Sequence, residues 1–524
     1  MKRLYFIVMF SLLMTSSCKP DDNSDENNNV QEYELIVTGN ISDFINDDNK
    51  LRITKLIINS SILSDDWSLL SEMASIGSLE ILDLTNVTIV GEEHNPYYND
   101  NEIPEYAFTA CNKLKEVYLP SNLQSIAKEA FSRCKKLKKV HFPETIEYIA
   151  PRAFYSTALS GEFFVPKNIK IIGKQAFAQT QFTKVILQSD VHSEKDEIVY
   201  TLNGNSVFAA CENLTDLVVE DGCTMLELGF ESCKSLTNVV LPSTLKYLGK
   251  ESNYTHNHIF SNCSGLSVID LPENLSEIGK SAFKNTSINK IVIPENVKTI
   301  ASLAFSDCNM LEEITLPMTL EIIDNSCFKD CIMLRGIIIP NKVQKINPST
   351  FENCSSLKSL VIGESVSVIE KEAFKNCTSL ESVVVPSNLN LIKESAFEGC
   401  FSLTSVVLSD GVKSIENTAF KDCVELRELN LGGSVTSIGN GCFYHCPKLE
   451  VLRIPVSVTN IGNNAFSYTG LKEVTVSWMT PLSLENNVFN GVHLFNAKLI
   501  VPNGTKDLYA LSPVWNGFNE IEEW

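Results

Sequence analysis

The sequence lacks the motifs that most enzyme classes need. No H-E-x-x-H pair, G-x-S-x-G elbow or phosphate-binding glycine loop occurs in it. Its acidic residues are spread along the chain, and no two of them stand out as a general acid and base. The seven histidines do not have the spacing of metal ligands: His94, His141, His192, His256, His258, His445 and His493. We therefore expect no catalysis, no metal and no cofactor.

Basic residues and tryptophan are also scarce. The chain has 43 Lys and Arg against 64 Asp and Glu, a net charge of −21. Proteins that bind nucleic acids present basic patches to the phosphates, so this balance argues against a nucleic-acid partner. It also argues against electrostatic adsorption to anionic lipid. No tryptophan occurs between Trp67 and Trp478, which argues against broad aromatic platforms for sugars.

Long apolar runs are missing as well. The stretch 4–14, which follows Lys2 and Arg3, is apolar but too short to remain in a bilayer as a spanning helix. We expect residues 1–17 to be a targeting signal. Residues 18–31 begin with Cys18 and are rich in Asp and Asn, a composition typical of an acidic, disordered tether.

The most informative feature that the sequence does have is a repeat. A phenylalanine returns about every 23 residues, and a cysteine usually follows three residues later. A fixed period of this size predicts a solenoid, in which each repeat is one coil stacked on the last. The series is Phe108, Phe131, Phe154, Phe177, Phe208, Phe230, Phe260, Phe283, Phe305, Phe328, Phe351, Phe374, Phe397, Phe420, Phe443, Phe466 and Phe489. Two coils are longer, and we expect their excess, in residues 188–205 and 250–258, to form loops.

One coil shows the chemistry of the repeat. From Cys111 it reads C-x-x-L-x-x-V-x-L-P-x-x-L-x-x-I-x-x-x-A-F. Val117 and Leu119 alternate with Tyr118 as in a short strand whose apolar side faces inward, and Pro120 ends that strand. The return path has no sustained period, so we expect turns and short 3-10 pieces there.

The cysteines have two interpretations. Twelve occupy the same repeat position: Cys111, Cys134, Cys211, Cys233, Cys263, Cys308, Cys331, Cys354, Cys377, Cys400, Cys423 and Cys446. Metal or redox chemistry would need convergent ligands, whereas here one thiol comes per coil. Thr157, Thr180, Thr286 and Thr469 replace it where the next apolar residue comes one position earlier, so the position follows the geometry of a corner. We favour the interpretation of these thiols as small core residues.

The two ends depart from the repeat. Within residues 32–100 we expect strands near 33–37, 53–58 and 79–84 and an amphipathic helix over 67–76, which together form an α/β cap on the first coil. Residues 478–524 hold a strand followed by Tyr509, Trp515, Phe518 and Ile521. We expect these side chains to form the core of a β-rich terminal cap; a ligand cage made by the aromatic rings is the alternative.

The L-x-x-V-x-L-P strand, the I-x-x-x-A-F return and the Cys that follows resemble the BspA-like, Treponema-type leucine-rich repeats of bacteria, over roughly residues 103–476. The resemblance implies a right-handed, curved solenoid over 101–477, with a parallel sheet on its concave face.

Residues 15–18, T-S-S-C, resemble a lipoprotein cleavage box in which Thr15 stands where Leu is commonest. This implies that Cys18 carries the lipid. The acidic stretch after Cys18 resembles the surface-export signal of Bacteroides-type lipoproteins. We expect a cell-surface lipoprotein of the outer membrane; simple secretion is the alternative.

Two patches of outward-facing strand residues are candidates for binding. The first is aromatic and consists of Tyr118, His141 and Phe164. The second is uncharged: Ile338, Val361, Val384 and Val407, beside Gly336, Ser359, Ser382 and Ser405. An exposed apolar strip is typical of a protein-binding site, but strand propensity on an open face explains the second patch equally well. Chance composition is the alternative for the first.

These observations support three hypotheses on function. The first is a monomeric, non-enzymatic adhesin-like protein, which binds host extracellular-matrix or microbial surface proteins through the concave face; BspA-like relatives imply this role. The second is glycan capture at Tyr118, His141 and Phe164 for nutrient uptake. The third is a structural envelope protein. In all three the only link to the membrane is the lipid on Cys18.

Overall fold

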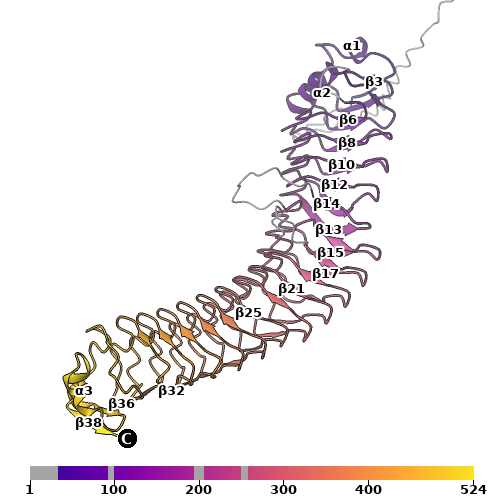
Figure 1. The fold of residues 1–524 in the computed structure, drawn as a ribbon. Helices are drawn as coiled ribbons and strands as arrows, with labels where there is room; N and C mark the ends of the chain where they lie inside the picture. Colours follow the sequence, from indigo (N-terminus) through magenta and orange to yellow (C-terminus); the bar gives the residue numbers. More distant parts are fainter. Residues whose placement is uncertain (1–32, 93–98, 194–205, 250–257) are drawn as a thin grey trace, which may run out of the picture.

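The computed structural model describes residues 33–92, 99–193, 206–249 and 258–524. Cys18, the targeting signal and the tether lie outside these residues, and so does most of the two loops predicted at 188–205 and 250–258. The chain forms one elongated parallel-strand solenoid that bends along its length, with a cap at each end (Figure 1).

One ladder of short parallel strands runs along the molecule and holds the L-x-x-V-x-L segment of most coils; the equivalent segment at residues 266–271 forms no strand. Its inward residues are buried, as Val117 and Leu119 illustrate. Hydrogen bonding divides this ladder into several sheets. Its strands are β1 (Glu34–Val37), β2 (Lys55–Ile58), β4 (Ile81–Asp83), β7 (Glu116–Tyr118), β9 (Lys139–His141), β11 (Ser160–Phe164), β13 (Gln181–Leu187), β15 (Asp216–Val219), β17 (Asn238–Val240), β20 (Lys290–Val292), β22 (Glu313–Thr315), β24 (Gly336–Ile338), β26 (Ser359–Val361), β28 (Ser382–Val384), β30 (Ser405–Val407), β32 (Glu428–Asn430), β34 (Val451–Ile454), β36 (Glu473–Val476), β37 (Lys498–Val501) and β38 (Glu520–Glu523).

A second parallel ladder lies on the return path. The expectation of short 3-10 pieces there was wrong: turns alternate with two-residue strands, and the 3-10 helices among the described residues lie near the C-terminus. Ile126 is typical, because it is buried while its neighbour Ser125 is half-exposed. The strands are β6 (Glu102–Ile103), β8 (Ser125–Ile126), β10 (Tyr148–Ile149), β12 (Ile171–Ile172), β14 (His192–Ser193), β16 (Met225–Leu226), β18 (Tyr247–Leu248), β19 (Glu277–Ile278), β21 (Thr299–Ile300), β23 (Ile322–Ile323), β25 (Lys345–Ile346), β27 (Val368–Ile369), β29 (Leu391–Ile392), β31 (Ser414–Ile415), β33 (Ser437–Ile438) and β35 (Asn460–Ile461).

The repeat phenylalanines form one continuous stack through the core. From Phe108 to Phe489, successive ring centroids are 5.1–6.2 Å apart and the ring planes are within 25° of parallel. Edge-on contacts close it at both ends, with Trp67 against Phe108 and Trp515 against Phe489, each at 6.0 Å. Each coil therefore buries its apolar side against its neighbours, as a solenoid requires.

The twelve cysteines of the repeat position occupy the corner beside this stack and are buried free thiols. Cys111, in the first coil, donates to the Ser71 carbonyl. The other eleven donate to the carbonyl of the phenylalanine one coil back, as Cys377 does to Phe351 O at 3.2 Å. Where threonine replaces cysteine, its hydroxyl donates within its own coil, as Thr286 does to Phe283 O at 2.9 Å. The structure thus confirms that this position belongs to the corner and the core.

The ends of the array are sealed by different elements. At the N-terminus, α1 (Ile41–Phe44), α2 (Asp66–Ser75) and the paired strands β3 (Ser61–Ile62) and β5 (Thr88–Ile89) accompany β1, β2 and β4. At the C-terminus, β37 and β38 extend the ladder beside η1 (Leu494–Asn496), α3 (Lys506–Leu511) and η2 (Trp515–Gly517). Tyr509, Trp515 and Phe518 are buried there, as expected for the core of a cap.

Candidate functional site: the strand face

The uncharged patch that the sequence predicts exists as a continuous surface feature. Strand register places Gly336 beside Ser359 and Ile338 beside Val361, and likewise Ser382 beside Ser405 and Val384 beside Val407. We call these eight residues the uncharged strip. Its four β-branched side chains are 47–75% exposed. At about 4.8 Å per strand, they span roughly 14 Å.

At the strand position that Gly336 and the three serines occupy in the strip, several other coils carry charged side chains, and these pair between adjacent coils. Lys139 Nζ lies 3.5 Å from Glu116 Oε1, Lys184 Nζ 3.6 Å from Glu162 Oε1, and Lys290 Nζ 3.0 Å from Glu313 Oε2. The equivalent positions in the strip hold one glycine and three serines. Glu313 in β22 and Glu428 in β32 bound the strip at its two ends. Four consecutive coils therefore omit the ionic ladder from their strand positions.

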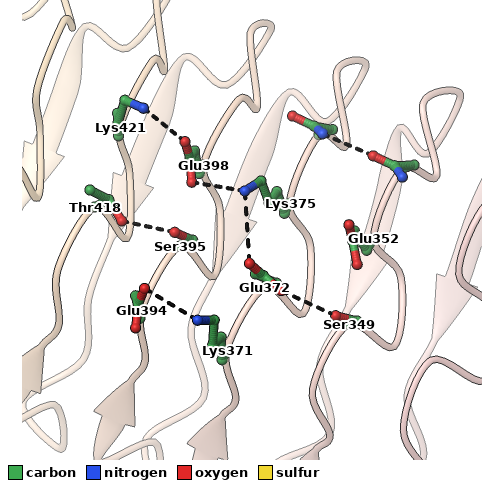
Figure 2. Close-up of polar contacts among 12 residues, drawn as sticks. Ser349, Glu352, Lys371, Glu372, Lys375, Glu394, Ser395, Glu398, Thr418 and Lys421 are labelled. Carbon is green, nitrogen blue, oxygen red and sulfur yellow. Dashed lines mark hydrogen bonds and ion pairs between the residues drawn. The ribbon is translucent and has the colours of Figure 1, made fainter.

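The same region of the solenoid gathers its ion pairs on the return side (Figure 2). Glu398 accepts Lys421 Nζ at 2.9 Å and Lys375 Nζ at 3.3 Å, and Lys371 Nζ lies 3.3 Å from Glu394. Burial alone would raise the pKa of Glu398, but the ammonium groups of Lys421 and Lys375 bring it below its usual value. In turn, the hydrogen bond that Lys421 donates to Glu398 raises the pKa of Lys421. These charges hold adjacent coils together and are not directed at the uncharged strip.

The aromatic patch is only partly assembled. Tyr118 and His141 stack with ring centroids 3.9 Å apart and planes at 6°, and His141 Nε2 lies 2.7 Å from Glu116 Oε1. This contact is the largest cause that lowers the pKa of Glu116. Phe164 is 54% exposed. It lies on β11, which starts a new sheet, whereas β9 ends the sheet that carries His141. Among the described residues, no ring contact joins Phe164 to the Tyr118–His141 stack.

Sequence reasoning missed two members of the exposed apolar column. Val240 and Val292 occupy the same strand position as Val361, and they are 48% and 67% exposed. At this strand position Asp270 lies between Val240 and Val292, and Thr315 lies between Val292 and the strip. The sequence could have identified both valines, because the position equivalent to Val361 can be read from the repeat in the coils outside the strip as well.

Within the described residues, the structure shows no group of three or more His, Cys, Asp or Glu side chains that could hold a metal ion. None of the helices it describes has the length and apolar character needed to cross a membrane.

Comparison with known proteins identifies the repeat. The family model for the BspA-type leucine-rich repeat region matches residues 101–206, 201–254, 253–381 and 367–496. Among curated proteins, none matches the chain.

Similar solved structures include a leucine-rich repeat protein from Bacteroides ovatus, at 25% identity over 76% of this chain and 87% of that one, with a TM-score of 0.46. The T. pallidum leucine-rich repeat protein is 32% identical over 30% of this chain and 75% of its own, with a TM-score of 0.28. A leucine-rich cell-surface protein from Faecalibacterium prausnitzii is 18% identical over 86% and 88%, with a TM-score of 0.29. Because the matched residues cover well over half of the sequence, the chain belongs to the BspA-type leucine-rich repeat family.

Proposed function

We propose that this protein is a non-enzymatic, cell-surface binding protein of adhesin type, and that the uncharged strip is where it binds a partner protein. The observation that carries the proposal is the exposure of Ile338, Val361, Val384 and Val407 on four successive coils. Repeat solenoids characteristically offer extended surfaces for binding. An apolar strip on such a surface, rimmed by charge, has the character of a protein contact.

The strip is suited to a partner that presents an apolar ridge. Burial of its exposed methyl groups would contribute favourable free energy of about 25 cal/mol per Å² of apolar surface. Gly336 and the three serines allow close approach without the desolvation of a charge. We assign the partner to host extracellular-matrix proteins or to proteins on other microbial surfaces, and the binding unit is a monomer.

The aromatic patch supports glycan capture less well. The ring of Tyr118 is already covered on one face by His141, and the His141 imidazole is engaged by Glu116. Phe164 remains as a single exposed ring, which gives a sugar one stacking surface at most.

The test is a binding screen of the purified protein against extracellular-matrix and microbial surface proteins at physiological salt. For a saturable partner, Val361→Glu with Val384→Glu should weaken binding by at least roughly 100-fold, because two carboxylates would be buried against an apolar surface. Val240→Glu with Val292→Glu is the matched control, since it places the same two charges at the same strand position outside the strip. Normal binding by the double variant would refute the site, and equal loss in the control would show that no particular strip is used.

The proposed location places Cys18 as the lipid anchor at the outer face of the outer membrane. Membrane fractionation should find the natural protein in the membrane and the Cys18→Ser variant in the soluble fraction, because the lipid is the only anchor proposed. External protease should digest the protein on intact cells. Protection from protease would contradict surface display, and membrane retention of Cys18→Ser would contradict the anchor.

A further inference from the structure

Charge is distributed unevenly along this acidic chain. Residues 111–189 contain thirteen Lys and Arg against five Glu, a net charge of +8, although the whole chain carries −21. We call these residues the basic section. They correspond to coils near the N-terminal end of the array, from β7 through β13 (Figure 1).

Part of this positive charge is neutralised between coils, and part is not. Lys139, Lys170 and Lys184 form ion pairs with Glu116, Glu147 and Glu162. At the cysteine corner of the second regular coil, Arg133, Lys135, Lys136 and Lys138 are all exposed. Among the described residues these four side chains have no carboxylate partner. The corner therefore presents a concentrated positive surface.

A hollow of about 350 Å³ adjoins this corner. It exists because the residue after the repeat phenylalanine is alanine in two successive coils, Ala178 and Ala209, whereas Tyr155 and Glu231 stand at that position on either side. Small-molecule sites have volumes of about 300–1,000 Å³, so this hollow is near the lower end of that range. The two alanines form its floor, and Tyr155 and Glu231 contribute to its walls.

Hydrogen bonds link the hollow to the basic corner. Lys135 Nζ contacts Ser156 Oγ, which donates to Gln179 Oε1 at 3.0 Å. The backbone N–H of Arg133 donates to the Tyr155 carbonyl at 2.7 Å. The Arg152 guanidinium lies 5.6 Å from the centre of the Tyr155 ring.

Donor groups face this space with capacity left for a ligand. Ser156 is the one hydrogen-bond partner of the Gln179 side chain among the described residues, so its amide NH₂ group can donate. Arg152 uses its Nε on Gln175 at 2.9 Å, and its Nη1 is 3.9 Å from Glu129, too long for a hydrogen bond. Among the described residues, no hydrogen bond engages the terminal N–H groups of Arg152, and such a guanidinium suits a planar carboxylate or a sulfate.

We propose that this hollow binds one residue of an acidic saccharide, that is, a sugar carrying a carboxylate or a sulfate. The sugar ring lies on Ala178 and Ala209 against Tyr155, and the anionic group of the sugar contacts Arg152 and the basic corner. The sugar hydroxyls accept hydrogen bonds from the Gln179 amide NH₂ group. The strip and the hollow lie on different coils, so this site is separate from the proposed protein contact.

The extent of the positive charge favours a short saccharide over a nucleic acid. The basic section spans only a few coils, roughly 15 Å at strand spacing. Outside residues 111–189 the chain carries a net −29, which repels a long polyanion. One aromatic wall also suits a single sugar ring better than the stacked bases of a single strand.

The experiment is calorimetric titration of the purified protein with a sulfated, uronic-acid-containing tetrasaccharide and with its desulfated, carboxyl-reduced counterpart. We expect saturable binding of the acidic form alone, weakening as salt is raised. Arg152→Gln with Lys135→Gln should reduce affinity by at least about tenfold, since hydrogen bonds to charged groups are removed. Lys342→Gln with Lys358→Gln is the matched control: it removes two exposed lysines from another part of the solenoid and should leave affinity unchanged.

A second variant separates the hollow from charge alone. Ala209→Leu fills the hollow without changing any charge, and the same repeat position accepts Tyr155 and lysines elsewhere, so the coil should fold. It should abolish saccharide binding. Undiminished binding by Ala209→Leu, equal loss in the lysine control, no binding of the acidic tetrasaccharide, or tighter binding of a single-stranded oligonucleotide would each overturn the proposal.

Discussion

At the scale of single residues, each position of the repeat has one physical task. Phenylalanine fills the centre, cysteine joins the corner to the carbonyl of the coil before, and threonine makes the equivalent bond within its own coil. The core role of the phenylalanine and the corner role of the cysteine could be predicted from the sequence, because substitution by threonine coincided with a shorter spacing at Thr157, Thr180, Thr286 and Thr469. The bond from a cysteine to the preceding coil could not, because it depends on how the coils stack. A metal ligand would have shown no such dependence on spacing.

Most of the buried thiols should be chemically inert. Burial raises the pKa to about 12 at Cys400 and Cys446 and to about 11 at Cys308, so little reactive thiolate exists at pH 8. Iodoacetamide at that pH should label few of the fifteen described cysteines in the folded protein and all of them in denaturant, as counted by mass spectrometry. Rapid labelling of the folded protein would contradict the burial of the cysteine file.

Removal of one ring from the phenylalanine stack should loosen the coils beside it. Phe374→Ala should lower the local free energy of opening by about 3–5 kcal/mol, because a fully buried ring is lost and a cavity remains. Hydrogen exchange of the amides in β26 and β28 measures this. The control is Phe401→Ala, because Phe401 is 47% exposed and should change stability by no more than about 0.5 kcal/mol. Equal effects of the two variants would show that the stack is not the core.

At the scale of elements, the first ladder could be predicted from the sequence and the second could not. Val117-Tyr118-Leu119 shows the alternation of a strand, whereas Ser125–Ile126 contributes one inward residue and is too short to show a period. The backbone of the next coil supplies that second ladder, through pairs such as Ile126 with Ile149. Likewise, the sequence places Tyr118, His141 and Phe164 at equivalent positions but does not reveal that the ladder breaks before β11.

The return-side ion pairs should make the coils around Glu398 sensitive to acid. Because the folded-state pKa of Glu398 is lowered, its stabilisation is present above the unfolded pKa of about 4.3 and is lost as pH falls through the folded pKa. Glu398→Gln should cost about 1 kcal/mol of local stability at pH 7 and nothing at low pH. Hydrogen exchange of coils 375–421 at pH 7 and in acid measures this; a pH-independent effect of the variant would contradict the role of the ion pairs.

At the scale of the whole molecule, one array carries surfaces of different character on different coils. The uncharged strip lies in the C-terminal half, and the basic section lies near the N-terminal cap. The strip could be predicted because a residue type recurs at one repeat position. The basic section was not predicted, because the net charge of all 524 residues conceals it. The hollow was not predicted either, because two alanines leave a hollow only where the folded chain places them between Tyr155 and Glu231.

The most direct test of the central claim is site-specific photocrosslinking of the protein to the partner found in the binding screen. A photoreactive phenylalanine analogue at Val384, within the strip, should crosslink to the partner. The same analogue at Val292, on the same column outside the strip, should not. Crosslinking at Val292 with none at Val384 would contradict the assignment of the uncharged strip as the binding surface.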